Sequence, residues 1–324
     1  DLSNEDLDAI VSGFGIPKYT PVGAPIQLEP NSADEAPSAL DDLPAPLTSS
    51  LDRINEFIDS DEQLLVISGM VGTGRELLIE PIVSKITAEG KSFTVLGPNR
   101  RYADRYPVEA QSIYSYAFAG NAKIEKDHIV YDLKANPDDK EHLYIVEDAH
   151  LIADSLFETE VFRYGSGQLL QDFLAFSDLK SGQRKIIFMG DPYQLGRGKP
   201  EESALSLERL EAKTGITPAF ISLDFLLDGD QINIFTRHNV ALANSIRQNL
   251  FNDLEIETDE DQCIAASDDK ETKTNLIKSS LEADQNSLKF VAYSHADVGQ
   301  FNAWVRKSVF NRDRELSVGD LIHI

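Results

Sequence analysis

The sequence predicts an α/β fold built on a mainly parallel β-sheet with helices on both faces. Three observations support this prediction. From Leu47 onward, strand-like and helix-like patterns alternate along the chain. The strand-like runs are continuously apolar, which is typical of strands buried on both faces. A glycine-containing loop joins one such run to a helix-like segment, as in nucleotide-binding sheets.

The expected elements follow from the apolar pattern in chain order. Helix-like periodicity occurs at 51–58 and 76–90. Short, apolar, strand-like runs occur at 64–69, 92–98, 142–150 and 184–192. A more polar segment, 121–136, predicts a small hairpin inserted ahead of the third of these strands.

Two domains are expected, because 324 residues suffice for two cores of roughly 100 to 200 residues each. Residues 1–46 are rich in proline, alanine and acidic residues, which predicts a tail or linker. Residues 47–225 are expected to form a first domain that contains the hairpin of 121–136. Residues 226–324 are expected to form a second, incomplete domain.

Composition narrows the class of protein. With 41% hydrophobic and 26% charged residues, the chain is typical of a globular protein. No apolar run approaches the length of a membrane span, and Asp1 does not open a signal peptide, so a cytoplasmic protein without membrane association is expected. Cys263 is the sole cysteine, which excludes an internal disulfide framework, and the six histidines lack metal-site spacing.

The charge of the chain restricts its partners. A net charge of −25 and a pI near 4.5 oppose non-specific attraction to nucleic acid, so any contact with DNA requires a local basic groove. Candidate basic clusters are Arg100, Arg101 and Arg105, and Arg306, Lys307, Arg312 and Arg314. Solvated helix faces explain both clusters equally well. The acidity itself fits either a salty cytoplasm or a basic partner protein.

Residues 64–78 carry the pattern of a phosphate-binding loop. Gly69, Gly72, Thr73 and Gly74 lie between a strand-like run and a helix-like run, where backbone N–H groups can cradle phosphates. A strand-to-helix turn that binds nothing is the alternative. The spacing of the three glycines in this context favours descent from a nucleotide-binding loop.

Two positions of this loop differ from a working phosphate site. Arg75 stands where a lysine reaches the β and γ phosphates, and Glu76 stands where a hydroxyl residue holds Mg²⁺. Arginine keeps the positive charge, although its planar fork is wider than an ammonium group. A carboxylate at position 76 either repels the nucleotide or binds the metal itself. The first change is compatible with nucleotide binding, whereas the second argues against hydrolysis.

Polar side chains follow two of the expected core strands. Glu147 and Asp148 come directly after an apolar run, at the carboxyl end of a strand, where open α/β sheets bind ligands. Glu147 is the candidate Mg²⁺ ligand, and helix capping is the alternative role for such acids. In GDPYQL (190–195), Gln194 can face a terminal phosphate, while Asp191 either serves the site or caps the turn.

With these motifs in place, the chain resembles the superfamily 1 DNA helicases, specifically the RecD-like group that includes Dda-like enzymes. The likeness covers residues from about 47 to 324 in the order of the family's motifs. Besides the phosphate loop and the acidic pair, it is carried by VLGPNRRYADR (95–105), EAQSIYSYAF (109–118), GDPYQL (190–195), 232–253 and 289–324. GDPYQL is the best preserved of these motifs.

The resemblance implies a RecA-like P-loop fold with a partial second RecA-like domain, ATP and Mg²⁺ as cofactors, and single-stranded DNA as partner. Catalytic roles are implied for Glu147, Asp148, Gln194 and Arg237, the last as sensor of the γ-phosphate. Nucleotide binding is implied for Gly69, Gly72, Thr73, Gly74, Arg75 and Glu76. Contacts with DNA are implied for Pro98, Asn99, Arg100 and Ser112.

The chain also departs from the family. Leu51 stands where an adenine-reading glutamine is expected, and the family's Asp-Glu pair is inverted to Glu147-Asp148. The inversion displaces the metal ligand and the water-activating acid by roughly 1 Å, which can cost orders of magnitude in rate. The sequence ends at Ile324, before the family's last motifs.

Two functions remain open from the sequence. One is an active, atypical ATP-dependent DNA helicase that uses Arg75 and Glu147. The other is a hydrolysis-deficient helicase-like protein that binds nucleotide or DNA, or acts as a scaffold with a protein partner in a repair or recombination assembly. The altered residues touch different catalytic roles, which favours the hydrolysis-deficient protein.

Overall fold

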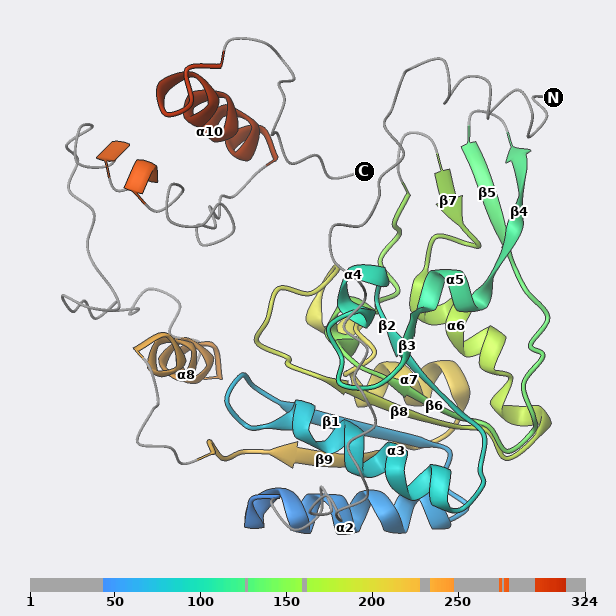
Figure 1. Ribbon diagram of the computed structural model, residues 1–324. Coiled ribbons are helices and arrows are strands. Elements are labelled where there is room, and N and C mark those ends of the chain that lie inside the picture. Colours follow the sequence, from blue (N-terminus) through green and yellow to red (C-terminus); the bar gives the residue numbers. More distant parts are fainter. Residues whose placement is uncertain are drawn as a thin grey trace, which may run out of the picture.

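The structure is a computed structural model that describes residues 43–125, 128–158, 162–227, 234–247, 274–275, 277–279 and 295–312 (Figure 1). The expected tail, 1–46, lies outside the described residues except for its last four. Most of 226–324 also lies outside them, so the second domain stays a prediction.

A six-stranded parallel sheet forms the centre of the protein (Figure 1). Its strands are β1 (Leu64–Gly69), β2 (Phe93–Gly97), β3 (Ala110–Ser112), β6 (Leu143–Val146), β8 (Lys185–Gly190) and β9 (Ala219–Leu223). The strand order is β3-β2-β6-β8-β1-β9, and each neighbouring pair is parallel. Because β8 lies between β1 and β6, the carboxyl ends of these three strands meet at one edge.

Helices cover both faces of this sheet. Within the described residues, the α-helices are α2 (Ala45–Asp59), α3 (Ile79–Ala88), α4 (Arg100–Ala103), α5 (Ile113–Ala117), α6 (Leu169–Ser177) and α7 (Leu207–Thr214), followed along the chain by α8 (Ile234–Arg247) and α10 (His295–Ser308). Short 3₁₀ helices are η1 (Arg75–Leu78), η2 (Ala149–Leu151), η3 (Leu179–Ser181) and η4 (Pro200–Glu202).

The side chains of β1 divide between two hydrophobic cores, one on each face. Leu65 and Ile67 pack into the core formed with α2 and α3. Leu64 and Val66 pack into the core formed with α5, α6 and α7. Successive side chains of a strand point to opposite faces, so a continuously apolar strand is what a sheet covered on both sides requires.

The helix expected at 76–90 is divided in the structure. Residues Arg75–Leu78 form the 3₁₀ helix η1, and the α-helix α3 begins at Ile79. Pro81 explains the division, because it has no N–H to donate to Leu77 and its ring would clash with that carbonyl inside an α-helix. At the start of α3 the same proline is tolerated.

A smaller sheet lies beside the main one and contains β4 (Phe118–Glu125), β5 (His128–Leu133) and β7 (Phe162–Tyr164). Strands β4 and β5 pair antiparallel, as a hairpin does, and β5 pairs parallel with β7. Aromatic rings connect this sheet to α5: Tyr164 stacks on Tyr131 at 4.9 Å and contacts Tyr114 at 4.6 Å between ring centroids.

The predicted fold class is confirmed. The protein has a RecA-like α/β fold, with a glycine-containing loop after a central strand of a parallel sheet and helices on both faces. In the part of the chain that the structure describes, no helix has both the length and the apolar character that crossing a membrane would require.

Candidate functional site

The loop after β1 has the backbone of a phosphate-binding loop. Gly72 and Gly74 adopt φ angles of 92° and 73°, a region that favours glycine. Thr73 is fully buried and donates from Oγ1 to the carbonyl of Met70 at 2.8 Å. The N–H of Leu227, beyond β9, donates to the carbonyl of Gly72 at 2.9 Å. The loop is therefore stabilised by one hydrogen bond within it and by another from the segment that follows β9.

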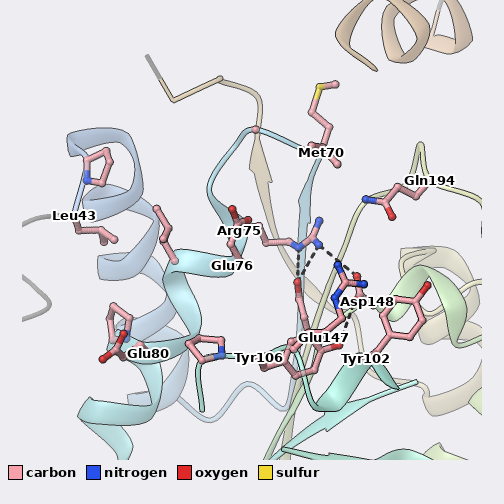
Figure 2. Close-up of a pocket in the computed structure, with 17 residues that line it drawn as sticks. Leu43, Met70, Arg75, Glu76, Glu80, Tyr102, Tyr106, Glu147, Asp148 and Gln194 are labelled. Carbon is pink, nitrogen blue, oxygen red and sulfur yellow. Dashed lines mark hydrogen bonds and ion pairs between the residues drawn. The ribbon is translucent and has the colours of Figure 1, made fainter. Parts of the chain in front are cut away.

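Arg75 turns inward rather than toward the space above the loop (Figure 2). Its Nε donates to Oε1 of Glu147 at 2.9 Å, and its Nη2 lies 2.9 Å from the same oxygen. Nη1 donates to the carbonyl of Gly69 at 2.6 Å. Nη2 also lies 3.7 Å from Oδ1 of Asp148. The guanidinium thus uses its hydrogen-bonding groups on the protein's own acceptors.

This cluster contains one cation and several acids. Burial alone lowers the pKa of Arg75, but the carboxylates of Glu147, Asp148 and Asp191 outweigh burial and raise it. Arg75 therefore stays charged at any ordinary pH. Burial raises the pKa of Glu147 to about 7, because the neighbouring guanidinium offsets only part of the cost of desolvation.

Glu147 is satisfied at only one of its two oxygens. The residue is 3% exposed, and within the described chain its buried Oε2 has no hydrogen-bond partner. A buried oxygen without a partner is costly, and such atoms mark sites that lack something. The carboxylate is therefore only partly neutralised by Arg75.

Asp148 is held in an unusual backbone conformation. Its φ angle is 52°, in the left-handed region that non-glycine residues rarely adopt. Its Oδ2 accepts a hydrogen bond of 3.0 Å from the hydroxyl of Tyr106. Burial, with the two nearby acids adding to it, raises the pKa of Tyr106, so the phenol stays protonated and donates. Strain of this kind is characteristic of functional sites.

A third carboxylate, that of Asp191 directly after β8, contacts the loop. Asp191 is buried, and its Oδ2 accepts the N–H of Val71 at 3.0 Å. Its Oδ1 accepts the N–H of Tyr193 at 2.8 Å, which is the turn-capping role. Gln194 donates to Oδ2 at 3.3 Å. A backbone N–H of the loop is thus already bound to an anion that belongs to the protein.

An open cavity of about 730 Å³ lies over these groups (Figure 2). Its volume is within the range of small-molecule sites. The charged residues of its lining are Arg75, Arg105, Glu76, Glu80, Glu147 and Asp148. The remaining lining residues are Leu43, Pro44, Met70, Val71, Gly72, Leu77, Pro81, Tyr102, Tyr106, Pro107 and Gln194. Four carboxylates therefore face two arginines in a cavity where a nucleotide would bring further negative charge.

The residues do not fit Mg²⁺. Among the described residues, no group of three or more His, Cys, Asp or Glu side chains is placed to hold a metal ion. Oε1 of Glu147, the expected ligand, is engaged by Arg75 at 2.9 Å. A guanidinium at this distance from the donor atom opposes a divalent cation. The hydroxyl that the loop would contribute is replaced by Glu76.

Most residues expected to form the nucleotide site thus lie around one cavity, but Arg75 and Glu147 are bonded to each other. The structure brings together Gly72, Arg75, Glu76, Glu147, Asp148 and Gln194 around the cavity, whereas Gly69, Thr73 and Gly74 support the loop beneath it. The position of Arg237 is within α8, and its side chain lies outside the described residues.

The residues expected to contact DNA lie after β2 and β3. Asn99 caps α4 by accepting the N–H of Tyr102 at 3.3 Å, and Ser112 caps α5 by accepting the N–H of Tyr114 at 3.3 Å. Pro98 is buried. The side chain of Arg100 is 81% exposed and pairs with Asp104 at 2.6 Å. Asn99 and Ser112 therefore have structural roles whether or not DNA binds.

Sequence reasoning missed several residues of the site. Tyr106, Tyr102 and Glu80 line the cavity but belong to no expected site, and Arg105 was expected only in a basic cluster that contacts DNA. Glu80 carries a usable signal, because it follows Glu76 by one helical turn and shares its face. The sequence gives no indication of the role of Tyr106, because its contact with Asp148 depends on the conformation of the segment between β2 and β3.

The chain is similar to known proteins in structure but matches none of the family models or curated sequences. Neither a scan of protein-family models nor a search of curated proteins finds a match. A structure of two coordinating Pif1 helicases at forked DNA is similar over 81% of this chain and 57% of its own, with 14% identity and a TM-score of 0.44. Pif1 helicase from Candida albicans is similar over 81% of this chain and 60% of its own, with 12% identity and a TM-score of 0.40.

A third similar structure is AMPPCP-bound DnaA from Aquifex aeolicus. It has 10% identity and a TM-score of 0.31, over 84% of this chain and 82% of its own. The chain therefore spans less than two thirds of the length of the two Pif1 helicase structures, with 57% and 60% covered.

Proposed function

We propose that this protein is a superfamily 1 helicase-like module of the RecD-like group that does not hydrolyse ATP and acts by binding single-stranded DNA within a larger assembly. The observation that supports it most is the ion pair between Arg75 and Glu147 at 2.9 Å. In a working site, the first position would contact phosphates and the second would hold the metal. Here the two side chains are bonded to each other instead.

Nucleotide hydrolysis would require several of these contacts to break together. Arg75 would have to leave Glu147 and the carbonyl of Gly69, which would leave Glu147 buried without a partner. Removing one partner of a buried pair costs about 3 to 5 kcal/mol. Glu76 would still face the triphosphate, and charges of like sign repel at short range. The arrangement therefore opposes catalysis at more than one step.

DNA binding is supported by the order of the motifs and by a local basic cluster. Arg100, Arg101 and Arg105 are exposed on and beside α4, near the carboxyl ends of β2 and β3. Exposed arginines in an acidic protein can contact the phosphate backbone only where they gather in this way. A protein partner remains part of the proposal, because the chain has a net charge of −25.

The test begins with calorimetry of ATP and Mg²⁺ binding to the wild type and to Arg75→Ala, followed by phosphate release with single-stranded DNA added. The proposal expects no DNA-stimulated release. Micromolar binding that Arg75→Ala abolishes, together with DNA-stimulated release, would show instead an active atypical helicase that uses Arg75 and Glu147.

The DNA-binding part is tested by fluorescence anisotropy with a labelled single strand. Arg101→Gln should weaken binding and reduce its salt dependence, because one phosphate contact is lost. Lys180→Gln is the matched control, since Lys180 is an exposed cation on η3, away from α4. Equal effects of the two substitutions would refute a specific DNA surface at α4.

A further inference from the structure

We infer that the cavity over the loop binds a guanidinium group, so that a site of phosphate-binding ancestry now takes a cation. The inference rests on the proposed absence of hydrolysis, because a site that works on Mg²⁺ and ATP must attract anions. It goes beyond that proposal by naming the chemical class of the ligand.

The first support is the sign of the charge around the cavity. Four carboxylates and two arginines line it, and one of the arginines, Arg75, is committed to Glu147. Asp191 lies behind the loop and adds another carboxylate to the same cluster, where it acts on Arg75. The acids outnumber the cations, and a cleft with an excess of one sign of charge concentrates ligands of the opposite sign.

The second support is the unsatisfied carboxylate at the floor of the cavity. Glu147 is 3% exposed, lines the cavity, and leaves Oε2 without a partner in the described structure. Arg75 pairs with the other oxygen only. A cation above this carboxylate would offset the remaining charge, since buried charges require compensation.

The third support comes from two acids on the wall. Glu76 and Glu80 are exposed, lie one helical turn apart and both line the cavity (Figure 2). Within the described residues, neither side chain has an ion pair or hydrogen bond. Carboxylates of like charge repel each other, and a cation bound in the cavity would relieve the repulsion.

The aromatic rings in the cavity lining favour a guanidinium ligand over an ammonium ligand. Tyr102 and Tyr106 present aromatic rings to the cavity, and the guanidinium of Arg105 already lies 5.7 Å from the ring centroid of Tyr102. Guanidinium groups stack on aromatic rings and form bidentate pairs with carboxylates, whereas ammonium is more strongly hydrated. The ligand is therefore free arginine or an arginine side chain of a basic protein.

The test is calorimetry of the full chain with three probes at low ionic strength. The probes are N-acetylarginine amide, a short peptide with one arginine flanked by glycines, and the matched lysine peptide. Both arginine probes should bind, and the lysine peptide should bind at least about fivefold more weakly. Tighter binding of the peptide than of the amide would identify a protein side chain as the source, and equal binding would identify a free ligand.

Substitutions locate the binding. Glu76→Gln with Glu80→Gln should weaken arginine binding about tenfold. The control is Glu208→Gln, which removes an exposed acid from the first turn of α7, away from the cavity. Equal affinities of the three proteins, or no binding of either arginine probe, would overturn the inference. Phosphate release from ATP would refute the proposed function instead, so the two failures are distinguishable.

Discussion

Arg75 and Glu147 are 72 residues apart in the chain, and their side chains meet through two contacts of 2.9 Å. The pair joins the loop after β1 to the end of β6, across β8, which lies between these two strands. Both partners are buried, with side chains 9% and 4% exposed. The pair therefore belongs to the packed interior and bears on stability as well as on ligand binding.

Breaking this pair from one side should be costly. Arg75→Met leaves Glu147 buried without its cation, and Glu147→Leu removes the nearest carboxylate from the buried Arg75, so each variant should lose about 3 kcal/mol of unfolding free energy. The double variant should recover most of the loss, because two apolar side chains need no compensation. Urea denaturation of the four proteins measures the coupling.

Arg100→Met is the control for this cycle, because it breaks an exposed pair with Asp104. It should cost under about 0.5 kcal/mol. Additive losses in the double variant of Arg75 and Glu147 would mean that the two side chains do not compensate each other.

Stability should also depend on pH through Glu147. Burial raises the pKa of Glu147 to about 7, above the ordinary 4.5 of the unfolded chain. The folded state then binds this proton more tightly, so the stabilisation is complete below about pH 4.5 and is lost as pH rises through about 7. Relative to Glu147→Gln, the wild type should lose about 2 kcal/mol of unfolding free energy between pH 5 and pH 8.

The two proteins share every other titrating group, including His142 and His150. Burial lowers the pKa of both histidines, which contribute in the opposite sense because their stabilisation is lost as pH falls. The measured quantity is therefore the difference between the two denaturation curves at each pH. A difference that does not change with pH would contradict a buried, titrating Glu147.

Placing the residue types of a working phosphate loop at positions 75 and 76 should allow nucleotide binding without catalysis. In Arg75→Lys with Glu76→Thr, the loop loses one carboxylate and gains a hydroxyl, so micromolar binding of ATP with Mg²⁺ is expected by calorimetry. Phosphate release should stay at background, because the order Glu147-Asp148 is unchanged. Arg75→Lys with Glu80→Gln removes the same charge but not from the loop, and should not bind ATP.

The backbone at Asp148 offers a test of strain. Because φ is 52°, Asp148→Ala should be about 1 kcal/mol less stable than Asp148→Gly. Both variants lack the carboxylate, so the comparison isolates the backbone. At Asp104, which has φ of −68°, the order should be reversed by about 0.5 to 1 kcal/mol. Thermal denaturation of the four variants measures both differences.

Four of the six strands of the main sheet, β1, β2, β6 and β8, could be predicted because each is a mainly apolar run. The edge strands β3 and β9 are not among the predicted runs: two of the three residues of β3 are polar, and β9 exposes Phe220 and Ser222. The 3₁₀ start of the helix after the loop was missed, although Pro81 is visible in the sequence, because the apolar period continues across it. For the site, the parallel sheet places Glu147 and the loop at one edge, which the sequence predicts.

What the sequence does not contain is the direction of the Arg75 side chain. A loop arginine can point at a ligand or at a neighbouring acid, and packing across β8 decides between them. The contact of Tyr106 with Asp148 is of the same kind, since it depends on a loop with no regular pattern.

The bond between Leu227 and Gly72 makes one amide a reporter for the whole loop. The N–H of Leu227 is 2.9 Å from the carbonyl of Gly72, and the Leu227 side chain fills the space beside Gly74. This proton can exchange with solvent only when the loop and the chain leaving β9 separate. Its exchange rate therefore measures how often the loop opens, without any ligand or activity assay.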